Sequence, residues 1–509
     1  MKQVVNDYKE KIKELVNNKK YMLAILITAI LGYGYYVTNV SIGMDDTCLD
    51  RYYGEFYSNN MICYGRWGSY LLYKILNLTS FTPFWVEALT VIIILLTTIL
   101  VSAFIVRNTK RDNIKLPIIF SCIYLSYSLI NEPLIFQTSN LAYVLSNLLI
   151  IGAIILWYEI FKENIKLKFR YMIIIYGIMA MTISMYEACC QTYITGLLIC
   201  MLILIIKDRK NNKDIFKFLI KGIGILIVSI VLYYAILKLF YIIGVPNKLS
   251  GGRNIYWFEN GIINGINTVV KNITYYTINR IMYFPVLELL ICEVIGLVLA
   301  IYAFIKQKNI YIFNIYILLV ISNFALSILQ CKQILYRTCI SWNLFVASTI
   351  TSVVIVFQNT KKIKNLLLCF IVLLVLWQTK DLNQWFYNED IKYKNDVYMG
   401  HSIANDIMKN TNYKFKPIVF AGVCKQRINA QNQIGAQSNG FTLFNWAPRA
   451  FDDNSYELIK FLRMLGYYFK NPTNEQWERG NELAAEMKEY PKDGYIKEYE
   501  DIIVVKLGE

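Results

Sequence analysis

The stretch FWVEALTVIIILLTTILVSAFIVRNTKRDNIK, residues 84–115, decides the fold class of this chain. Residues 84–106 are almost entirely apolar, and a helix of that length crosses the roughly 30 Å hydrocarbon core of a bilayer. Residues 107–115 then bring a cluster of Lys and Arg, which is typical of the cytoplasmic end of a membrane span. The stretch therefore predicts a transmembrane helix.

The same alternation of apolar runs and basic gaps recurs along three quarters of the chain. The composition agrees with it: 56% of the 509 residues are hydrophobic and 17% are charged, whereas soluble domains carry about 25% charged residues. The sequence predicts a polytopic α-helical membrane protein with about 11 transmembrane helices. The apolar runs lie near 21–40, 84–106, 116–131, 140–161, 171–186, 190–206, 217–240, 284–305, 310–328, 338–357 and 365–379.

The net charge of +16 is unevenly distributed along the chain. Residues 380–509 hold 17 Lys and Arg against 18 Asp and Glu, so the excess lies in residues 1–379. There, every second gap is basic, and these gaps with the N-terminal stretch hold about 25 basic residues, against about ten in the other gaps. The positive-inside rule then places the N-terminus in the cytoplasm and residues 380–509 outside. It also accounts for the charge without a nucleic-acid partner.

Three domains follow from this topology. Residues 1–20 read as a cytoplasmic basic amphipathic segment before an uncleaved signal anchor. Residues 21–379 form the membrane domain, and residues 380–509 are expected to form a small exported α/β domain. The membrane domain has two long exported loops, 41–83 and 246–283.

The exported domain shows both strand and helix patterns. "KPIVFAG" (416–422) and "DIIVVKL" (501–507) are typical of buried strands. Thr473 followed by Gln476 is the signature of a helix-capping box. Helical patterns cover 394–410, 455–468 and 474–489.

Few catalytic chemistries are open to this chain. The single histidine, His401, nearly excludes His-based metal sites and Ser-His-Asp catalysis. Catalysis must therefore come from carboxylates, Arg, Lys or Tyr. Cys48 and Cys63 share the first exported loop, and the sequence leaves open whether they form a disulfide.

Two adjacent aspartates, Asp45 and Asp46, follow the first span by about five residues. Adjacent side chains project in different directions, so the pair does not form one clamp. One carboxylate can act as a base while the other orients it or holds a sugar hydroxyl or a cation. We favour Asp46 as the residue that faces the acceptor. The alternative is a solvated polar end of the span.

Two arginines in the same loop, Arg51 and Arg66, carry planar cationic forks suited to phosphate. "GRWGSYLLYKIL" (65–76) is typical of a short interfacial helix, with Trp67 at headgroup level, and Arg66 could equally anchor that helix to headgroups. Carboxylates beside phosphate-binding arginines fit the transfer of a sugar from a lipid-phosphate donor. The leaving phosphate needs cations, and the acceptor hydroxyl needs a base.

Other exported gaps offer further candidates. Lys332 and Arg337 near a span end are candidates for the donor phosphate, with Arg51 and Arg66. Residues 262–273 have the apolar spacing of a helix lying on a membrane. The alternatives are turn glutamates and an aromatic interfacial belt. Candidates for sugar or acceptor binding are Trp67, Glu132, Tyr186, Glu187, Gln191, Arg253 and Trp257.

These features together resemble a known family. "IGMDDT" after the first span, an arginine soon after it and "GRW" opening a short helix are similar to the Gtr-type glucosyltransferases of bacteria and their phages, which belong to the GT-C class. The strongest marks lie at 42–67, 381–405 and 471–507. The tail ends "NEQWERGNELAAEMKEYPKDGYIKEYEDIIVVKL".

The resemblance implies a GT-C-like enzyme in the bacterial cytoplasmic (inner) membrane. It implies a polyprenyl-phosphate glucose donor, presented on the outer leaflet by a separate synthase and flippase. It implies a cell-surface polysaccharide acceptor such as O-antigen, teichoic acid or capsule. The class places its catalytic acids in the first exported loop, which corresponds here to Asp45 and Asp46.

Other functions remain as alternatives. The chain could be a flippase or transporter of lipid-linked sugars, although no half-to-half repeat is visible, or a polysaccharide polymerase or ligase. A receptor would not need the clustered acids and arginines. We expect no cofactor, because arginines can neutralise one lipid phosphate; a Mg²⁺ or Mn²⁺ ion on the two acids is the alternative.

Overall fold

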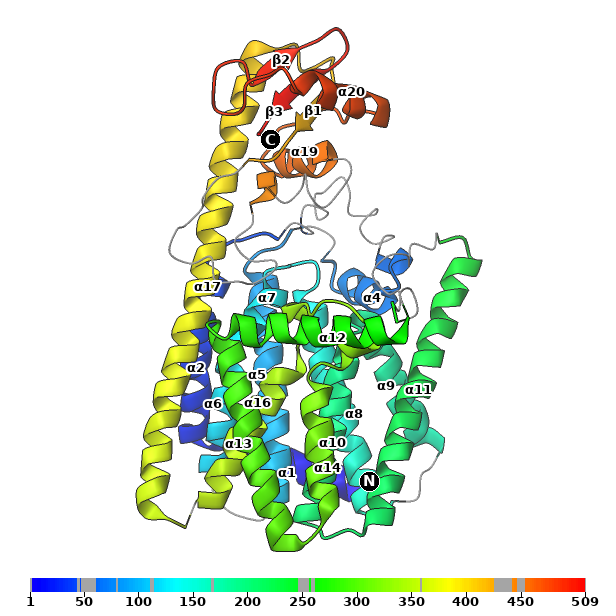
Figure 1. The fold of residues 1–509 in the computed structure, drawn as a ribbon, viewed down its shortest axis with the longest axis vertical. Helices are drawn as coiled ribbons and strands as arrows, with labels where there is room; N and C mark the ends of the chain where they lie inside the picture. The colour runs from blue at the N-terminus through cyan, green and yellow to red at the C-terminus, as the bar shows by residue number, and fades with distance from the viewer. Residues whose placement is uncertain are drawn as a thin grey trace.

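The computed structural model places a small α/β module at one end of a bundle of long helices (Figure 1). The structure describes residues 2–43, 46, 61–78, 81–109, 114–165, 169–245, 256–257, 261–357, 359–424, 442–445 and 454–508. We call the α/β part, with the last turns of α17, the C-terminal module. The end of the bundle that carries it is the module end, and the opposite end is the α1 end.

Within the described residues, seven helices are long and apolar enough to cross a membrane. Four shorter apolar helices accompany them. Each of these helices overlaps one of the apolar runs in the sequence. The long helices are α2 (Lys19–Thr38), α5 (Trp85–Thr109), α8 (Asn140–Lys162), α10 (Cys189–Ile206), α11 (Asn212–Ile242), α13 (Phe284–Gln307) and α17 (Lys361–Asn410); the shorter ones are α6 (Lys115–Ser126), α9 (Phe169–Met185), α14 (Ile310–Ser322) and α16 (Ser341–Phe357).

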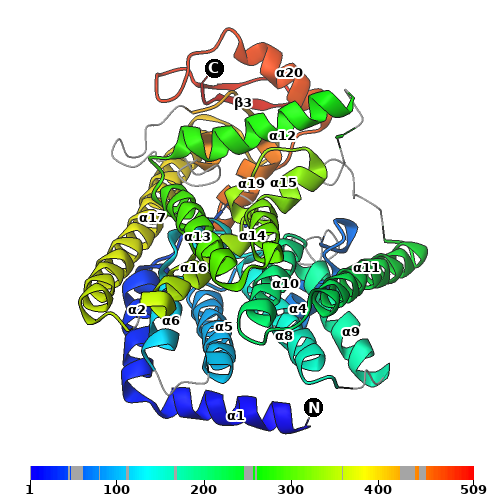
Figure 2. The ribbon, with the colours of Figure 1, turned by 60° about the horizontal axis from the view of Figure 1, so that its bottom comes forward.

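The outside of the bundle is apolar, as contact with lipid requires. Helix α11 lies at the rim of the bundle (Figure 2). It exposes large apolar side chains along its length, among them Phe216, Ile220, Ile227, Val231 and Leu239. In water such a surface would be an aggregation hazard, whereas in a bilayer it faces acyl chains. The apolar outer surface is therefore compatible with a membrane protein.

Helix α17 is the structural link between the bundle and the C-terminal module. Its 50 residues correspond to a length of about 75 Å. It packs along α2 inside the bundle, and the Tyr35 hydroxyl donates to Asp390 Oδ2 at 2.7 Å. Residue 380, where the sequence pattern places a domain boundary, lies inside this unbroken helix. The last apolar run and the first helix expected in the exported domain are thus one element.

The C-terminal module contains a three-stranded sheet in the order β1-β3-β2. β1 (Ile418–Ala421) and β3 (Ile503–Lys506) are parallel, with Ile418 opposite Ile503, and they confirm the two strands expected from the sequence. β2 (Ile496–Glu498), which the sequence analysis missed, pairs antiparallel with β3. Helices α19 (Asn454–Met464) and α20 (Asn474–Ala484) pack on the sheet, and α20 begins with the expected Thr473–Gln476 capping box.

Three helices lie across the bundle instead of along it. Helix α12 (Ile262–Tyr276) crosses the module end (Figure 1), and α1 (Lys2–Asn17) crosses the opposite end (Figure 2). The short helix α4 (Trp67–Ile75) lies at the module end. Both helices expected at 65–76 and 262–273 therefore form.

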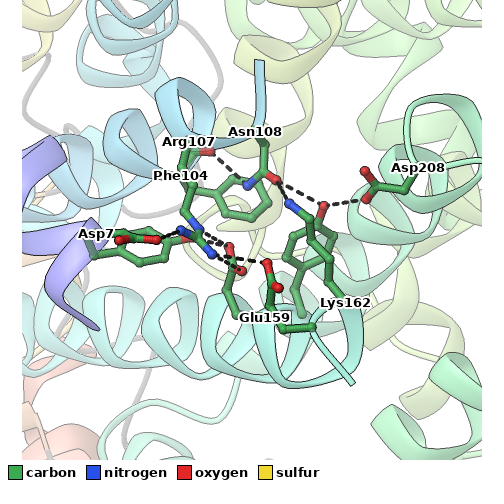
Figure 3. Close-up of polar contacts among 10 residues, drawn as sticks. Asp7, Phe104, Arg107, Asn108, Glu159, Lys162 and Asp208 are labelled. Carbon is green, nitrogen blue, oxygen red and sulfur yellow. Dashed lines mark hydrogen bonds and ion pairs between the residues drawn. The ribbon is translucent and has the colours of Figure 1, made fainter. Parts of the chain in front are cut away.

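A charged network ties α1 to the bundle (Figure 3). The guanidinium of Arg107 on α5 donates to both carboxylate oxygens of Glu159 on α8, at 3.0 and 3.1 Å, and also to Asp7 on α1. The Tyr8 hydroxyl donates to Glu159 Oε1 at 2.7 Å. Because Glu159 is 1% exposed, its charge depends on these partners.

We expect Arg107→Met to destabilise the protein by about 3 kcal/mol, because it leaves a buried carboxylate without its cation. Thermal unfolding of the purified protein in detergent measures this as a lowered Tm. Lys11→Met is the matched control, since it removes an exposed ion pair with Glu14 and should cost under about 1 kcal/mol. Equal Tm values for the two variants would refute the importance of the network.

Candidate active site

Segments that are far apart in the sequence meet at the module end of the bundle. They are the residues after α2, the start of α4, the short helices η2 (Ser128–Ile130) and α7 (Asn131–Leu134), the link between α9 and α10, and η4 (Tyr336–Thr338). The helix α7 contacts both η2 and η4, and α17 contacts η2 and α7. Most of the gaps that the sequence predicts to be exported thus lie in one region.

Asp46 is completely buried at the centre of this region. Its Oδ2 accepts the backbone N–H of Gly43 at 2.7 Å, and its Oδ1 accepts the backbone N–H of Thr138 at 2.8 Å. The carboxylate therefore joins the segment after α2 to the segment before α8. This geometry does not favour the expectation that Asp46 faces the acceptor, because both oxygens are turned into the protein. Asp45 lies outside the described residues.

Helix α17 brings a buried lysine, Lys392, to the segment after α2. This lysine is not among the candidates predicted from the sequence. Lys392 Nζ donates to the Ile42 carbonyl at 3.3 Å and to Glu389 Oε2 at 2.7 Å. Lys392 is 3% exposed and Glu389 is 1% exposed. The signal in the sequence is a Glu–Lys pair at i,i+3. Nothing local indicates that it meets a segment 350 residues earlier.

Gly43 is packed so closely that no side chain fits. A Cβ atom there would lie 2.5 Å from the ring of Phe136, and the guanidinium of Arg337 lies 5.5 Å from the centre of that ring. Gly43 also donates to Asp46. The lack of a side chain at Gly43 thus allows its backbone, which is hydrogen-bonded to Asp46, to pack against the Phe136 ring beneath Arg337.

We expect Gly43→Ala to lower the rate of the glycosyl transfer implied by the family resemblance about tenfold. The added methyl group must displace either Phe136 or the backbone at Gly43 that is hydrogen-bonded to Asp46. Rates of transfer by the purified variant measure this effect. Gly34→Ala on α2 is the control, since a Cβ there makes only an ordinary contact at 3.9 Å with Ile30 and alanine favours a helix. Equal activity of the two variants would contradict the role of Gly43.

Arg66 and Arg337 flank one buried tyrosine, Tyr186. The Arg66 guanidinium lies 5.9 Å from the centre of the Tyr186 ring, and the Tyr186 hydroxyl donates to the Arg337 carbonyl at 3.1 Å. Burial raises the pKa of Tyr186 to about 12, and the charges of Arg337 and Arg66 oppose this rise. Both arginines are only partly buried. We call Arg66 and Arg337 the arginine pair; they are two of the four cations that the sequence analysis assigned to the donor phosphate.

Glu132 adds a carboxylate to this cluster. It is completely buried in α7, and its charge contributes to the raised pKa of Tyr186. The region thus combines two partly exposed guanidinium groups, a neutral phenol and buried carboxylates. Guanidinium groups are planar cationic donors of the kind that bind a phosphate.

Three candidates for sugar binding make other contacts. Trp67 is buried in an apolar cluster with Ile62, Ile183 and Tyr233. Gln191 Nε2 donates to the Asn323 carbonyl at 2.6 Å and to Ser341 Oγ at 2.9 Å, inside the bundle. Glu187 Oε1 accepts the Tyr233 hydroxyl at 3.2 Å. These contacts give Trp67 and Gln191 packing roles, and they place Glu187 against α11.

Two further candidates lie beside α12. Lys332 Nζ is 4.5 Å from the centre of the Tyr256 ring, and the Trp257 indole N–H donates to the Ile328 carbonyl at 2.7 Å. The described contacts of Lys332 and Trp257 do not include the arginine pair. Arg51, Arg253 and Cys48 lie outside the described residues, so the structure places neither these arginines nor a bond from Cys48 to Cys63.

One comparison with known proteins finds a match. Residues 34–358 match the model of a family described as glucosyl transferase GtrII. The matched range includes the arginine pair, Tyr186, Glu132 and Asp46, and it ends before α17. No curated protein and no solved structure matches the chain.

Proposed function

This chain belongs to the glucosyl transferase GtrII family, and we propose that it transfers glucose or a similar hexose from a polyprenyl-phosphate donor to a cell-surface polysaccharide. The observation that carries the proposal is the arginine pair, whose two charges both act on Tyr186 at the module end. A lipid-linked phosphate is an anion held at a membrane surface, and paired guanidinium groups are well suited to bind it.

The proposed setting is the cytoplasmic (inner) membrane of a bacterium. The basic gaps in the sequence favour an α1 end in the cytoplasm and an exported C-terminal module. A GT-C-like arrangement with about 11 spans is compatible with the seven long and four shorter apolar helices of the described chain. In this orientation the arginine pair faces the outer leaflet, where a polyprenyl-phosphate sugar made and flipped by other proteins would arrive.

The proposed reaction is a single displacement at the anomeric carbon. The acceptor hydroxyl attacks this carbon, and the bond from the carbon to the phosphate oxygen breaks. The phosphate keeps the electron pair of that bond, and the arginine pair stabilises its growing charge. A carboxylate takes the proton of the acceptor hydroxyl. The donor, the acceptor and the base therefore account for every bond and proton in this step.

We assign the base to Asp45 and a positioning role to Asp46. Both carboxylate oxygens of Asp46 already accept backbone N–H groups, so the carboxylate is held in place by the backbone and is suited to positioning. Asp45 is the other acid of the pair singled out in the sequence, and we therefore take it as the candidate for the base. The scheme needs no metal ion, since the arginine pair supplies the positive charge.

The test is a transfer assay with the purified protein, polyprenyl-phosphate glucose and a cell-surface polysaccharide, followed by linkage analysis of the product. A glucosyl branch on the polysaccharide supports the proposal. Transfer from a lipid-diphosphate oligosaccharide alone would instead identify a polymerase or ligase. Activity that survives a chelator of divalent cations supports the metal-free scheme, and loss that Mg²⁺ or Mn²⁺ restores would refute it.

A further inference from the structure

A polar cavity of about 330 Å³ lies beside α12, apart from the residues of the arginine pair. Its volume falls at the lower end of the range of about 300–1,000 Å³ found for small-molecule sites. One wall belongs to α12, and the other is formed by Tyr256 and by the residue after α15 (Ala325–Gln330). The lining side chains are Asn264, Asn267, Thr268, Lys271, Tyr256 and Cys331.

The wall on α12 is a stripe of polar side chains. Asn264, Asn267, Thr268 and Lys271 are spaced at i, i+3, i+4 and i+7, so they share one face of the helix. They offer two carboxamides, a hydroxyl and an ammonium group. Carboxamides both donate and accept hydrogen bonds, as the hydroxyls of a sugar also do. The ammonium group of Lys271 lines the cavity and disfavours a cation as its ligand.

The opposite wall is held by hydrogen bonds to the end of α15. The backbone N–H of Tyr256 donates to the Gln330 carbonyl at 3.1 Å, and the Trp257 indole donates to the Ile328 carbonyl at 2.7 Å. The ammonium group of Lys332 packs against the ring of Tyr256. This aromatic wall therefore has a fixed position.

The two walls meet at Gly265. A Cβ atom at Gly265 would lie 2.7 Å from the ring of Trp257, so only glycine allows this approach. The Cys331 thiol donates to the Gly265 carbonyl at 3.4 Å. Close packing and hydrogen bonds thus fix the width of the cavity before any ligand binds, which lowers the cost of binding.

We propose that this cavity binds one saccharide unit of the acceptor polysaccharide. The carboxamides and the hydroxyl of α12 bond the sugar hydroxyls, and Tyr256 offers an aromatic surface to the sugar ring. Lys271 favours a unit that carries a carboxylate or a phosphate. The inference rests on the proposed function only in taking the acceptor to be a polysaccharide. The subsite would then hold the acceptor chain while another unit of it is glucosylated.

Saturation-transfer NMR on the purified full-length protein tests binding without any reaction. The probes are methyl glucoside and methyl glucuronide, which differ in the carboxylate. The variants are Asn267→Leu and Thr268→Val, which remove polar groups with little change in size. Asn272→Leu on the same helix is the matched control, because Asn272 does not line the cavity.

We expect the wild type and Asn272→Leu to transfer saturation to a glycoside, more strongly to the glucuronide, and the two cavity variants to lose the signal. Equal signals in all four proteins would overturn the proposal, as would no signal in the wild type. Binding of a short-chain phosphatidylglycerol, a membrane lipid, without binding of either glycoside would assign the cavity to lipid and also overturn it.

Transfer kinetics separate this inference from the proposed function. In the cavity variants we expect the KM for the acceptor to rise about tenfold, as the loss of a few hydrogen bonds predicts, while the KM for the donor stays within about twofold. Normal transfer with an unchanged acceptor KM would overturn the subsite and leave the function standing. A wild type that binds glycosides but transfers no glucose would overturn the function and support the subsite.

Discussion

Replacing Asp45 with asparagine is expected to lower the rate of glucosyl transfer by about 10² to 10⁴ while the protein stays folded. In the proposed reaction the Asp45 carboxylate takes the proton of the acceptor hydroxyl, and a carboxamide cannot. The donor should still bind, because its phosphate contacts the arginine pair. The measurement is kcat and KM for polyprenyl-phosphate glucose in proteoliposomes, together with Tm.

Asp46→Asn is the informative comparison. Both oxygens of the Asp46 carboxylate accept backbone N–H groups, and an amide would point its NH₂ group at one of those donors. We expect this variant to lower Tm, because a buried donor loses its acceptor, and to reduce activity through the displaced segment. The opposite result would be full activity for Asp45→Asn and, for Asp46→Asn, a catalytic defect at unchanged Tm. That result would make Asp46 the base and Asp45 the positioning residue.

Replacing either member of the arginine pair with alanine is expected to lower kcat/KM for the donor about 100-fold. In the proposed reaction the pair stabilises the charge that develops on the leaving phosphate, and losing one such donor costs about 10²–10³ in other enzymes. Lysine keeps the charge but lacks the planar fork. Arg66→Lys and Arg337→Lys should therefore recover only part of the loss.

Arg280→Ala is the control for the arginine pair. Arg280 is an arginine of η3 (Ile278–Arg280), and its guanidinium lies 5.2 Å from the centre of the Tyr275 ring, a contact of the same kind as that of Arg66 with Tyr186. We expect its activity to stay within about twofold of the wild type. A similar loss in all three alanine variants would show a general effect of positive charge and contradict a specific phosphate site.

Much of the fold could be predicted because membrane spans leave a strong local signal. Apolar runs, basic gaps and amphipathic spacing each depend on neighbouring residues, and they located the apolar helices of the bundle and the helices α4 and α12. The continuity of α17 could not be predicted from hydropathy. Hydropathy falls near residue 380, whereas the hydrogen bonds of a helix continue through such a change.

Two of the candidate cations, Arg66 and Arg337, were selected because basic residues are scarce in the gaps that the sequence predicts to be exported. The structure places both near Tyr186. Nothing in the sequence shows that Asp46 is buried, since one of its partners is the backbone N–H of Thr138, 92 residues later. Trp67 and Gln191 were candidates for sugar binding because the sequence does not show their contacts with residues on other helices.

The most direct test of the central claim follows radiolabelled glucose in proteoliposomes loaded with polyprenyl-phosphate glucose and supplied with polysaccharide outside. The account predicts that wild-type protein oriented with its C-terminal module outside makes labelled polysaccharide, and that Asp45→Asn protein makes almost none. Labelled lipid that crosses the bilayer without any labelled polysaccharide would identify a transporter and contradict the account.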